Sequence, residues 1–175
     1  AVPDWVEPTR TTIDAEGGET ISVVADVTNA QDCQRAVEAA VENYGALHIL
    51  HNNVGGRSAS GTVVEASDDD WRQSTALNVM SAIHMSRYSV PHMKSSGGGA
   101  ITNVSSVAAL RPKRDASSAL YTVDKAAVVG LTGAMALDHA ADNIRVNCIN
   151  PGATRTGMRA SAYPAENPAT VKPAS

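Results

Sequence analysis

Four apolar runs rich in β-branched residues alternate with helical patterns along the chain, and this alternation limits the possible folds more than any other feature. The runs cover residues 20–27, 47–53, 100–106 and 144–150. Their length is typical of buried strands rather than of helices. Helices are predicted between them, over residues 30–44, 71–93 and 118–141. Strands and helices in this order predict an α/β fold, a parallel sheet with helices on its faces.

Capping residues support two of these helices. Thr28 or Asn29 can cap the helix that begins near Ala30. The acidic run 68–70 stands ahead of Trp71, where the positive end of a helix dipole favours negative charge. Beyond Gly152 the chain contains Pro164, Pro168 and Pro173 without apolar periodicity. We therefore predict one ordered domain over residues 1–158 and an irregular tail over 159–175.

Composition restricts the partners. The chain has 175 residues, 43% of them hydrophobic and 18% charged, and its formal net charge is -4. Such a chain has no electrostatic footprint for nucleic acid or an anionic membrane, and no apolar run approaches the roughly 20 residues of a membrane helix. Cys33 and Cys148 lack metal-ligand spacing, so we expect reduced thiols, no metal site and a cytoplasmic protein.

Tyr121 and Lys125 are the most informative pair of residues. They are four apart on a predicted helix and so lie on one face. A phenol titrates near 10, and a neighbouring ammonium stabilises the phenolate. Lowering the tyrosine pKa to about 7 takes roughly 3 units, or about 4 kcal/mol. The pair alone also fits an ordinary helix with a buried tyrosine and a solvated lysine.

Three predicted strands end in polar or glycine-containing turns. These turns are 52–56, the serines 105 and 106, and 150–156. The carboxyl ends of parallel strands meet at one edge of a sheet, where ligands bind in open α/β folds. A serine at that edge can hydrogen-bond a substrate oxygen beside the tyrosine hydroxyl.

In order along the chain, these elements resemble the short-chain dehydrogenase/reductase family from about Glu16 to Met158. Residues 52–55 are similar to its Asn-Asn-Ala-Gly element, with Val54 in place of the usual alanine. Asn78 matches a helix asparagine that holds a water, Ser106 rather than Ser105 matches the catalytic serine, and Tyr121 and Lys125 match the catalytic pair. The resemblance implies that the cofactor-binding residues are Asp26, Val27, Asn53, Val54, Gly55, Tyr121, Lys125, Pro151, Gly152, Thr154 and Thr156.

What the resemblance implies is an NAD- or NADP-dependent oxidoreductase that transfers a hydride between the nicotinamide and a small carbonyl or secondary alcohol substrate. Tyr121 would be the general acid or base, Ser106 would orient the substrate oxygen, and Lys125 would lower the tyrosine pKa. The complete enzyme would be a homo-oligomer. Asp124 stands where the family more often has Ser or Ala; we expect it to be exposed, although pairing with Lys125 would weaken the effect on Tyr121.

The chain departs from the family in lacking the glycine-rich dinucleotide turn. We interpret it as an incomplete Rossmann-like doubly wound parallel sheet, missing the first two strands and the last, and expect these residues alone to be inactive. The strand near Leu47 would then be an exposed edge, with residues 20–27 either moved beside it or loosely held. A non-catalytic relic or interaction module is the alternative, while the substrate and the choice of NAD or NADP stay open.

Overall fold

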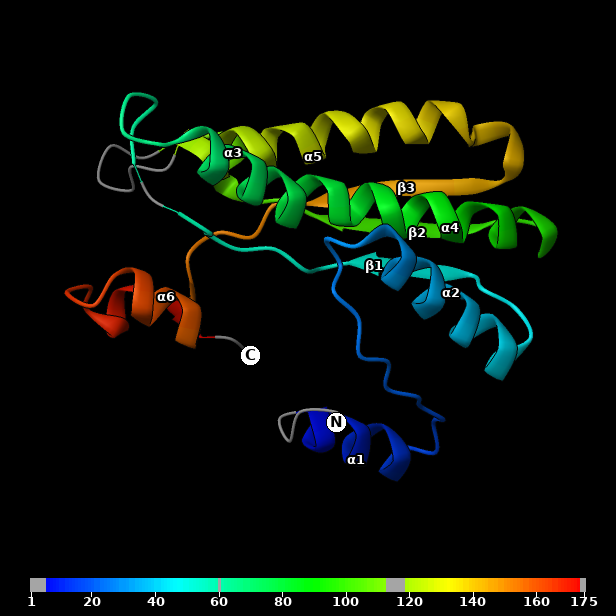
Figure 1. Cartoon of the computed structure of the whole chain (residues 1–175). Helices are drawn as coiled ribbons and strands as arrows, with labels where there is room; N and C mark the ends of the chain where they lie inside the picture. Colours follow the sequence, from blue (N-terminus) through cyan, green and yellow to red (C-terminus); the bar gives the residue numbers. More distant parts are fainter. Residues whose placement is uncertain (1–5, 60, 113–118, 174–175) are drawn as a thin grey trace.

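A three-stranded parallel sheet forms the centre of the computed structural model, which describes residues 6–59, 61–112 and 119–173. The strands are β1 (Ile49–Asn52), β2 (Gly99–Val104) and β3 (Ile144–Ile149), in the order β1-β2-β3. Leu50 is in register with Ile101, and Ile101 with Val146. The structure thus confirms an incomplete Rossmann-like α/β fold with a parallel sheet (Figure 1).

The principal helices follow the predicted positions. They are α2 (Ala30–Tyr44), α3 (Asp68–Thr75), α4 (Ser81–Ser95) and α5 (Ala119–Asp138). The Asn29 side chain caps α2, and Ser67 with Asp70 forms a capping box at α3. The helix predicted over 71–93 is interrupted by a π-helical turn, η2 (Ala76–Met80), whose wider winding changes the direction in which its side chains project.

Helices cover one face of the sheet. α4 packs against β1 and β2, α5 packs against β2 and β3, and α2 packs against α4 (Figure 1). The buried cluster beneath them is Leu50, Met93, Ile101, Met135, Ile144 and Val146. Burial alternates along β3, with Ile144 and Val146 buried and Arg145 and Asn147 exposed. The sheet therefore packs on one side, whereas the sequence predicted helices on both faces.

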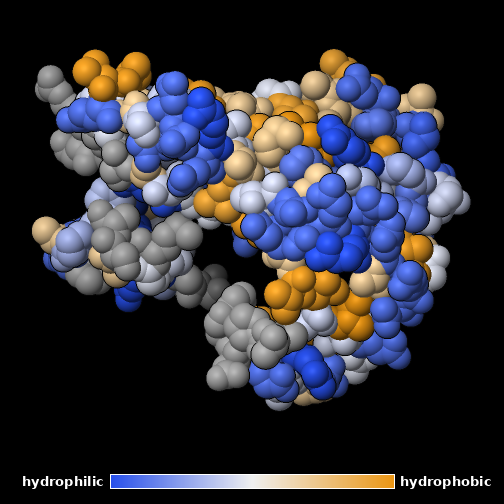
Figure 2. All heavy atoms as spheres, viewed as in Figure 1, coloured by the Kyte–Doolittle hydropathy of each residue, from blue (hydrophilic) through white to orange (hydrophobic). Residues whose placement is uncertain are grey.

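The strand predicted over residues 20–27 is not formed. Residues 18–26 carry no secondary structure, and Ile21, Val23 and Val24 are exposed. A strand is stabilised by hydrogen bonds to neighbours, and neither edge of the described sheet pairs with this segment. The prediction of a strand was wrong, and of the two placements considered the loosely held one matches the structure. Figure 2 shows apolar surface over this segment, which joins α1 (Glu7–Ala15) to α2.

Both edges of the described sheet are open. β1 and β3 each pair only with β2 among the described residues. Ile49 on β1 is 72% exposed, whereas its neighbour Leu50 is buried. The predicted exposed edge at β1 is confirmed.

The tail is more ordered than the sequence predicts. It contains β4 (Thr154–Arg155), α6 (Gly157–Ala162), η5 (Pro168–Thr170) and β5 (Lys172–Pro173), with β4 parallel to β5. Arg159 stacks on the Tyr163 ring at 4.5 Å and also pairs with Glu166. The expectation of an irregular tail was wrong, because polar side chains rather than apolar periodicity hold this segment. α6 also continues across the predicted boundary at residue 158.

The remaining elements are short 3₁₀ turns, η3 (Val107–Ala109) and η4 (Ala140–Asp142). Although the sequence shows no long uninterrupted apolar run, α5 is long and apolar enough to cross a membrane by length and composition alone. In this structure α5 packs on the sheet, and its charged residues Asp124 and Lys125 are buried.

Candidate functional site

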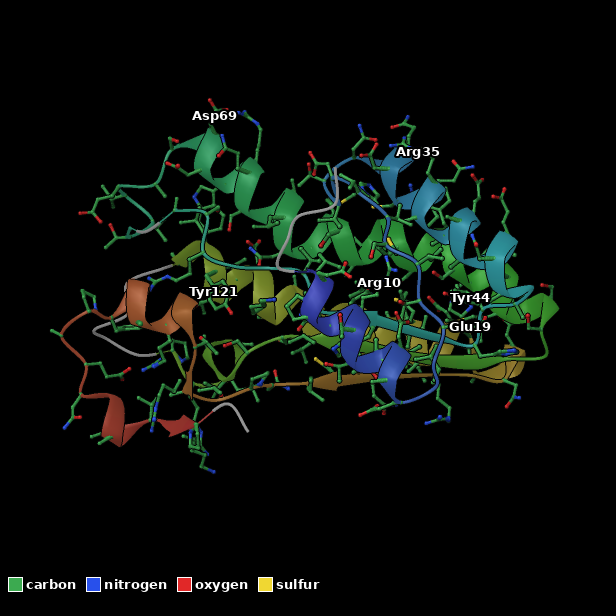
Figure 3. All side chains as sticks on the ribbon, turned by 90° about the horizontal axis from the view of Figure 1, so that it is seen from below. Arg10, Glu19, Arg35, Tyr44, Asp69 and Tyr121 are labelled. Carbon is green, nitrogen blue, oxygen red and sulfur yellow. The ribbon has the colours of Figure 1, made fainter. Side chains whose placement is uncertain are left out.

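The carboxyl ends of the three parallel strands define one edge of the sheet, and the predicted catalytic residues gather there. The backbone amide of Ser105, just after β2, donates to the Ile149 carbonyl at 2.9 Å. The Val107 amide donates to the Pro151 carbonyl at 3.0 Å. The segments after β2 and β3 therefore stay side by side beyond the strands. Figure 3 shows Tyr121 at the same end of the molecule as α6, with Glu19 and Tyr44 at the other end.

Asn78 lies in the π-helical turn η2 and is buried. Its Oδ1 accepts from the Gly56 amide, and its Nδ2 donates to the Gly56 carbonyl, both at 2.9 Å. The same Nδ2 donates to the Ser74 carbonyl at 3.0 Å. Asn78 thus fixes the loop that follows β1 against the helix layer.

Lys125 is buried, and its ammonium points at the end of β2. Nζ donates to the Val104 carbonyl at 2.9 Å and lies 5.7 Å from the centre of the Tyr121 ring. Burial lowers the pKa of Lys125 below its ordinary value, and electrostatic interactions with Asp124 and Cys148 partly oppose that shift. The two residues of the predicted pair therefore do lie together, four positions apart on α5.

Gly55 is located where only a glycine fits. A Cβ at this position would lie 2.8 Å from the Asn78 Oδ1 and 2.8 Å from the Lys125 Nζ. No side chain can be placed at that separation without moving one of these groups. Because residue 55 has no side chain, the loop can lie close to both the Asn78 side-chain amide and the Lys125 ammonium.

The two serines after β2 point to different places. Ser105 is buried, and its Oγ donates to the Lys125 carbonyl at 2.6 Å. Ser106 is half-buried, and its Oγ accepts from the Ala108 amide at 3.2 Å, which begins η3. Sequence reasoning missed the role of Ser105, which supports the backbone of α5 at Lys125. Ser106 lies at the same edge of the sheet and is only partly buried.

Asp124 is not exposed, contrary to the sequence-based expectation. Only 1% of the residue is accessible, and its carboxylate accepts from Ser74 Oγ at 2.5 Å and from Thr75 Oγ1 at 2.9 Å. The structure records no ion pair between Asp124 and Lys125 among the described residues. Asp124 is four residues before the buried Val128 and lies on the same face of α5.

A second set of polar residues lies beneath the site and was not singled out from the sequence. Asn52 Nδ2 donates to Asn103 Oδ1 at 2.8 Å and to Ser86 Oγ at 3.2 Å. Asn103 Nδ2 donates to Thr132 Oγ1 at 2.9 Å. These contacts join β1, β2, α4 and α5, and they satisfy polar groups that burial would otherwise penalise. The sequence signal that could have indicated this set is an asparagine near the carboxyl end of each of two strands, Asn52 on β1 and Asn103 on β2.

The predicted cofactor-binding residues fall into three groups. Asn53, Val54, Gly55, Pro151 and Gly152 lie in the loops at the edge of the sheet that carries Tyr121 and Lys125. Thr154 is paired within β4, and the Thr156 side chain caps α6, so both take part in the tail.

Asp26 and Val27 lie apart from this cluster, in the turn before α2. The Asp26 carboxylate accepts from the Thr28 hydroxyl and amide, which lowers its pKa, and its own amide donates to Asp32. No described hydrogen bond joins Asp26 or Val27 to Asn78, Tyr121 or Lys125.

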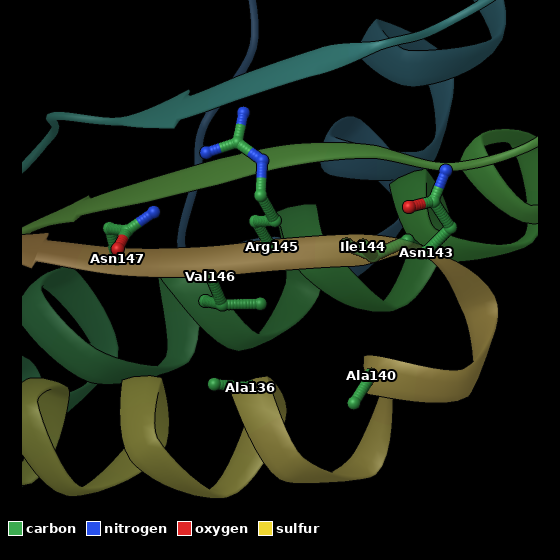
Figure 4. A pocket seen from close by; sticks show the side chains of 7 residues that line it. All are labelled: Ala136, Ala140, Asn143, Ile144, Arg145, Val146 and Asn147. Atoms are coloured by element: carbon green, nitrogen blue, oxygen red, sulfur yellow. The ribbon is translucent and has the colours of Figure 1, made fainter.

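Other candidate sites carry less chemistry. A pocket lies between α5 and β3, lined by Ala136, Ala140, Asn143, Ile144, Arg145, Val146 and Asn147 (Figure 4). It adjoins the beginning of β3 and the last turns of α5, whereas Tyr121 and Lys125 are in the first turns of that helix. Within the described ranges, no group of three His, Cys, Asp or Glu residues could hold a metal ion.

Known proteins resemble this chain in sequence and in fold. The family model described as short chain dehydrogenase matches residues 3–167. An uncharacterized oxidoreductase of Thermotoga maritima is 40% identical over 159 residues, which are 89% of this chain and 61% of that protein.

Solved structures show the same fold. The L-sorbose reductase of Gluconobacter frateurii, in complex with NADPH and L-sorbose, superposes with a TM-score of 0.81 at 35% identity, over 87% of this chain and 57% of that one. An NAD⁺-bound xylitol dehydrogenase also gives a TM-score of 0.81, at 31% identity, over 87% of this chain and 58% of that one. This chain spans about three fifths of the length of these relatives. On this sequence and structural agreement, the chain belongs to the short-chain dehydrogenase/reductase family.

Proposed function

We propose that this chain carries the catalytic part of an NAD(P)-dependent oxidoreductase that interconverts a carbonyl and a secondary alcohol on a small molecule. The observation that supports it most directly is the buried Lys125 ammonium, 5.7 Å from the centre of the Tyr121 ring. A cation held there stabilises negative charge that develops on the tyrosine oxygen during proton transfer. The neighbouring Ser106 hydroxyl supplies a second polar group at the same edge of the sheet.

The proton chemistry follows from these three residues. In the reducing direction the Tyr121 hydroxyl donates a proton to the substrate oxygen, and in the oxidising direction the phenolate takes it back. Ser106 Oγ hydrogen-bonds the same oxygen and fixes its direction. Asn78 holds the loop after β1 in place through its two hydrogen bonds to Gly56. This loop then forms a fixed side of the site in which the substrate oxygen is bound.

The donor set at Lys125 fits a nicotinamide cofactor. An ammonium has three hydrogens, and one of them goes to the Val104 carbonyl. The other two have no hydrogen-bond acceptor among the described residues, and the hydroxyls of a ribose would supply acceptors. Gly55 lets the loop backbone come close to whatever lies beside Lys125. When bound, the nicotinamide supplies or accepts the hydride.

The relatives named above include one bound to NADPH with a sugar and one bound to NAD⁺. The sequence contains no glycine-rich pyrophosphate turn, so the affinity of these 175 residues alone for either cofactor should be weak.

Cofactor titration tests the proposal. NADH and NADPH are titrated to millimolar concentration while nicotinamide fluorescence is followed, with Lys125→Met as the matched variant. Weak binding that Lys125→Met abolishes would support the assignment. Binding that is indifferent to residue 125 would place the cofactor elsewhere, and no binding at all would favour a non-catalytic role for the isolated chain.

Activity is the second measurement. Reduction of small ketones by NADH or NADPH is compared between the chain and Tyr121→Phe, which removes only the phenolic hydroxyl. Turnover that persists in Tyr121→Phe would contradict the assigned role of Tyr121.

A further inference from the structure

We propose that Asp124 is a positioning residue of the site, whose buried carboxylate ties the Asn78 turn to α5 and provides the negative charge that keeps Lys125 an ammonium. The importance of this residue for catalysis rests on the proposed function. The tie and the charge are properties of the folded chain and can be measured without turnover.

The first support is the set of hydrogen bonds to the carboxylate. Ser74 Oγ donates to Oδ2 at 2.5 Å, Thr75 Oγ1 donates to Oδ1 at 2.9 Å, and Asn78 Nδ2 approaches Oδ2 at 3.5 Å. All three donors come from the continuous helix of α3 and η2, whereas Asp124 lies on α5. A carboxylate has two oxygens that can accept at once, which a serine or alanine does not. Asp124 therefore bridges two helices at the turn that carries Asn78.

The second support is the position of Asn78 between the two charged residues. Its Nδ2 faces the Asp124 carboxylate, and its Oδ1 lies 2.8 Å from the Cβ position of Gly55, which is also 2.8 Å from the Lys125 Nζ. A carboxylate can only accept hydrogen bonds, so it favours the orientation in which the Asn78 NH₂ group faces it. The carbonyl of the amide is then directed toward Gly56 and the ammonium.

The third support is the burial of the pair. Asp124 and Lys125 are adjacent in sequence, and only 1% and 3% of the two residues is accessible. An ammonium removed from water tends to lose its proton unless an opposite charge lies near. The titratable groups that act on Lys125 are Asp124 and Cys148 on β3, which both raise its pKa against the effect of burial, and the Tyr121 ring lies 5.7 Å from its Nζ. Of these, Asp124 is the one whose side chain is buried with Lys125 on the same helix and held by hydrogen bonds from Ser74 and Thr75.

Titration of Lys125 by NMR tests the charge. The lysines are at positions 94, 113, 125 and 172, so ¹³C-labelled lysine ε-carbons give few signals, and Lys125→Arg assigns the one of interest. Asp124→Asn keeps the size of the side chain and removes its charge, and it should move the Lys125 titration midpoint to lower pH. Asp124→Glu should restore the midpoint toward that of the unaltered chain.

Two control variants separate charge from structure. Asp142→Asn removes the partner of Lys94, 2.9 Å away, and should shift the Lys94 signal while leaving Lys125 unchanged. Ser74→Ala removes one hydrogen bond to Asp124 without removing the charge, and it should leave the Lys125 midpoint in place. If Ser74→Ala shifted Lys125 as far as Asp124→Asn, packing rather than charge would be responsible, and the charge assignment would be wrong.

Hydrogen exchange tests the tie. The Gly56 amide, which donates to Asn78, should exchange faster in Asp124→Asn than in the unaltered chain, because the Asn78 amide is no longer held from the α5 side. An unchanged Lys125 midpoint and unchanged Gly56 exchange in a folded Asp124→Asn protein would overturn the proposal. Should Asp124→Asn not fold, Asp124→Ser, with a residue common in the family, replaces it with the same expected shifts. Failure of the chain to bind NADH or NADPH would leave these readouts intact.

Discussion

Asn78 and Gly56 exchange two hydrogen bonds of 2.9 Å each, so that one side-chain amide pairs with both backbone groups of one loop residue. Such an exchange resembles the pairing of two residues across a β-ladder, with a side chain in place of the second backbone. It ties the π-helical turn η2 to the segment after β1, where no strand continues. The loop that carries Gly55 is therefore tied to the helix layer next to the point where β1 ends.

Replacing Asn78 with alanine should destabilise the protein. The change leaves the Gly56 amide and carbonyl without their partners, which costs about 2 kcal/mol in the free energy of unfolding. Chemical denaturation measures it. Asn43→Ala is the matched control, since Asn43 makes one exposed hydrogen bond to the Ala39 carbonyl, and it should change stability far less.

A methyl group at position 55 should disturb the site more than the fold. In Gly55→Ala the new Cβ would be forced against the Asn78 Oδ1 and the Lys125 Nζ. The ammonium, at the end of a flexible chain, should move away from the Val104 carbonyl, and the Lys125 ε-carbon signal should shift accordingly. Gly133→Ala on α5, where a Cβ meets nothing within 4 Å, should leave that signal unchanged.

The adjacent serines should separate stability from activity. Ser105→Ala removes the hydrogen bond from Ser105 Oγ to the Lys125 carbonyl. It should lower the melting temperature, because the buried Lys125 carbonyl loses a hydrogen-bond donor. Ser106→Ala should leave the melting temperature nearly unchanged and should reduce carbonyl reduction wherever turnover is measured. The reverse pattern would move the catalytic role to Ser105.

The exposed edge of β1 should govern association. Ile49 is 72% exposed on the edge strand β1, so Ile49→Lys adds a charge there without disturbing the core. The change should reduce association of the protein, seen as lower light scattering at high concentration, without loss of stability. Leu50→Lys, one residue further along, should unfold the protein, since Leu50 belongs to the core. Equal effects of the two changes would mean that the edge is covered in solution.

Acid should weaken the start of α3. Hydrogen bonds from the side chain and the backbone of Ser67 lower the pKa of Asp70 below its ordinary value of 3.8. A carboxyl group whose pKa is lower in the folded state contributes stability that is present above 3.8 and is lost as the pH falls through the folded pKa. The stability difference between the unaltered chain and Asp70→Asn, measured by denaturation at several pH values, should be constant at neutral pH and shrink below 3.8.

The sequence predicted those elements whose pattern and partners both lie within the chain. The runs that became β1, β2 and β3 agree with the structure to within two residues at each end, and Asn29, one of the two predicted capping residues, caps α2. The run at residues 20–27 has the same composition but no neighbour in the described sheet, and it does not form a strand. Composition reports a preference for extended backbone, whereas pairing decides whether a strand forms.

The sequence predicted which residues form the candidate site, but not the buried hydrogen bonds that hold them in place. Asn78, Tyr121 and Lys125 meet as the resemblance implies, whereas the direction of Ser105 depends on which side of β2 faces α5. The burial of Asp124 required knowing that Ser74 and Thr75 lie opposite it, 50 and 49 residues away. Contacts over such separations are set by tertiary packing, which no local pattern encodes.

The hydrogen bonds that join Gly56, Ser74, Asn78, Ser105, Asp124 and Lys125 involve no described residue before β1. The described hydrogen bonds that hold these six residues together thus come from β1 onward. A separate polypeptide bearing a pyrophosphate-binding turn, supplied in trans against the open edge of β1, would meet these residues already assembled. Split-protein complementation follows from that independence, with the join between the two pieces falling ahead of Ile49.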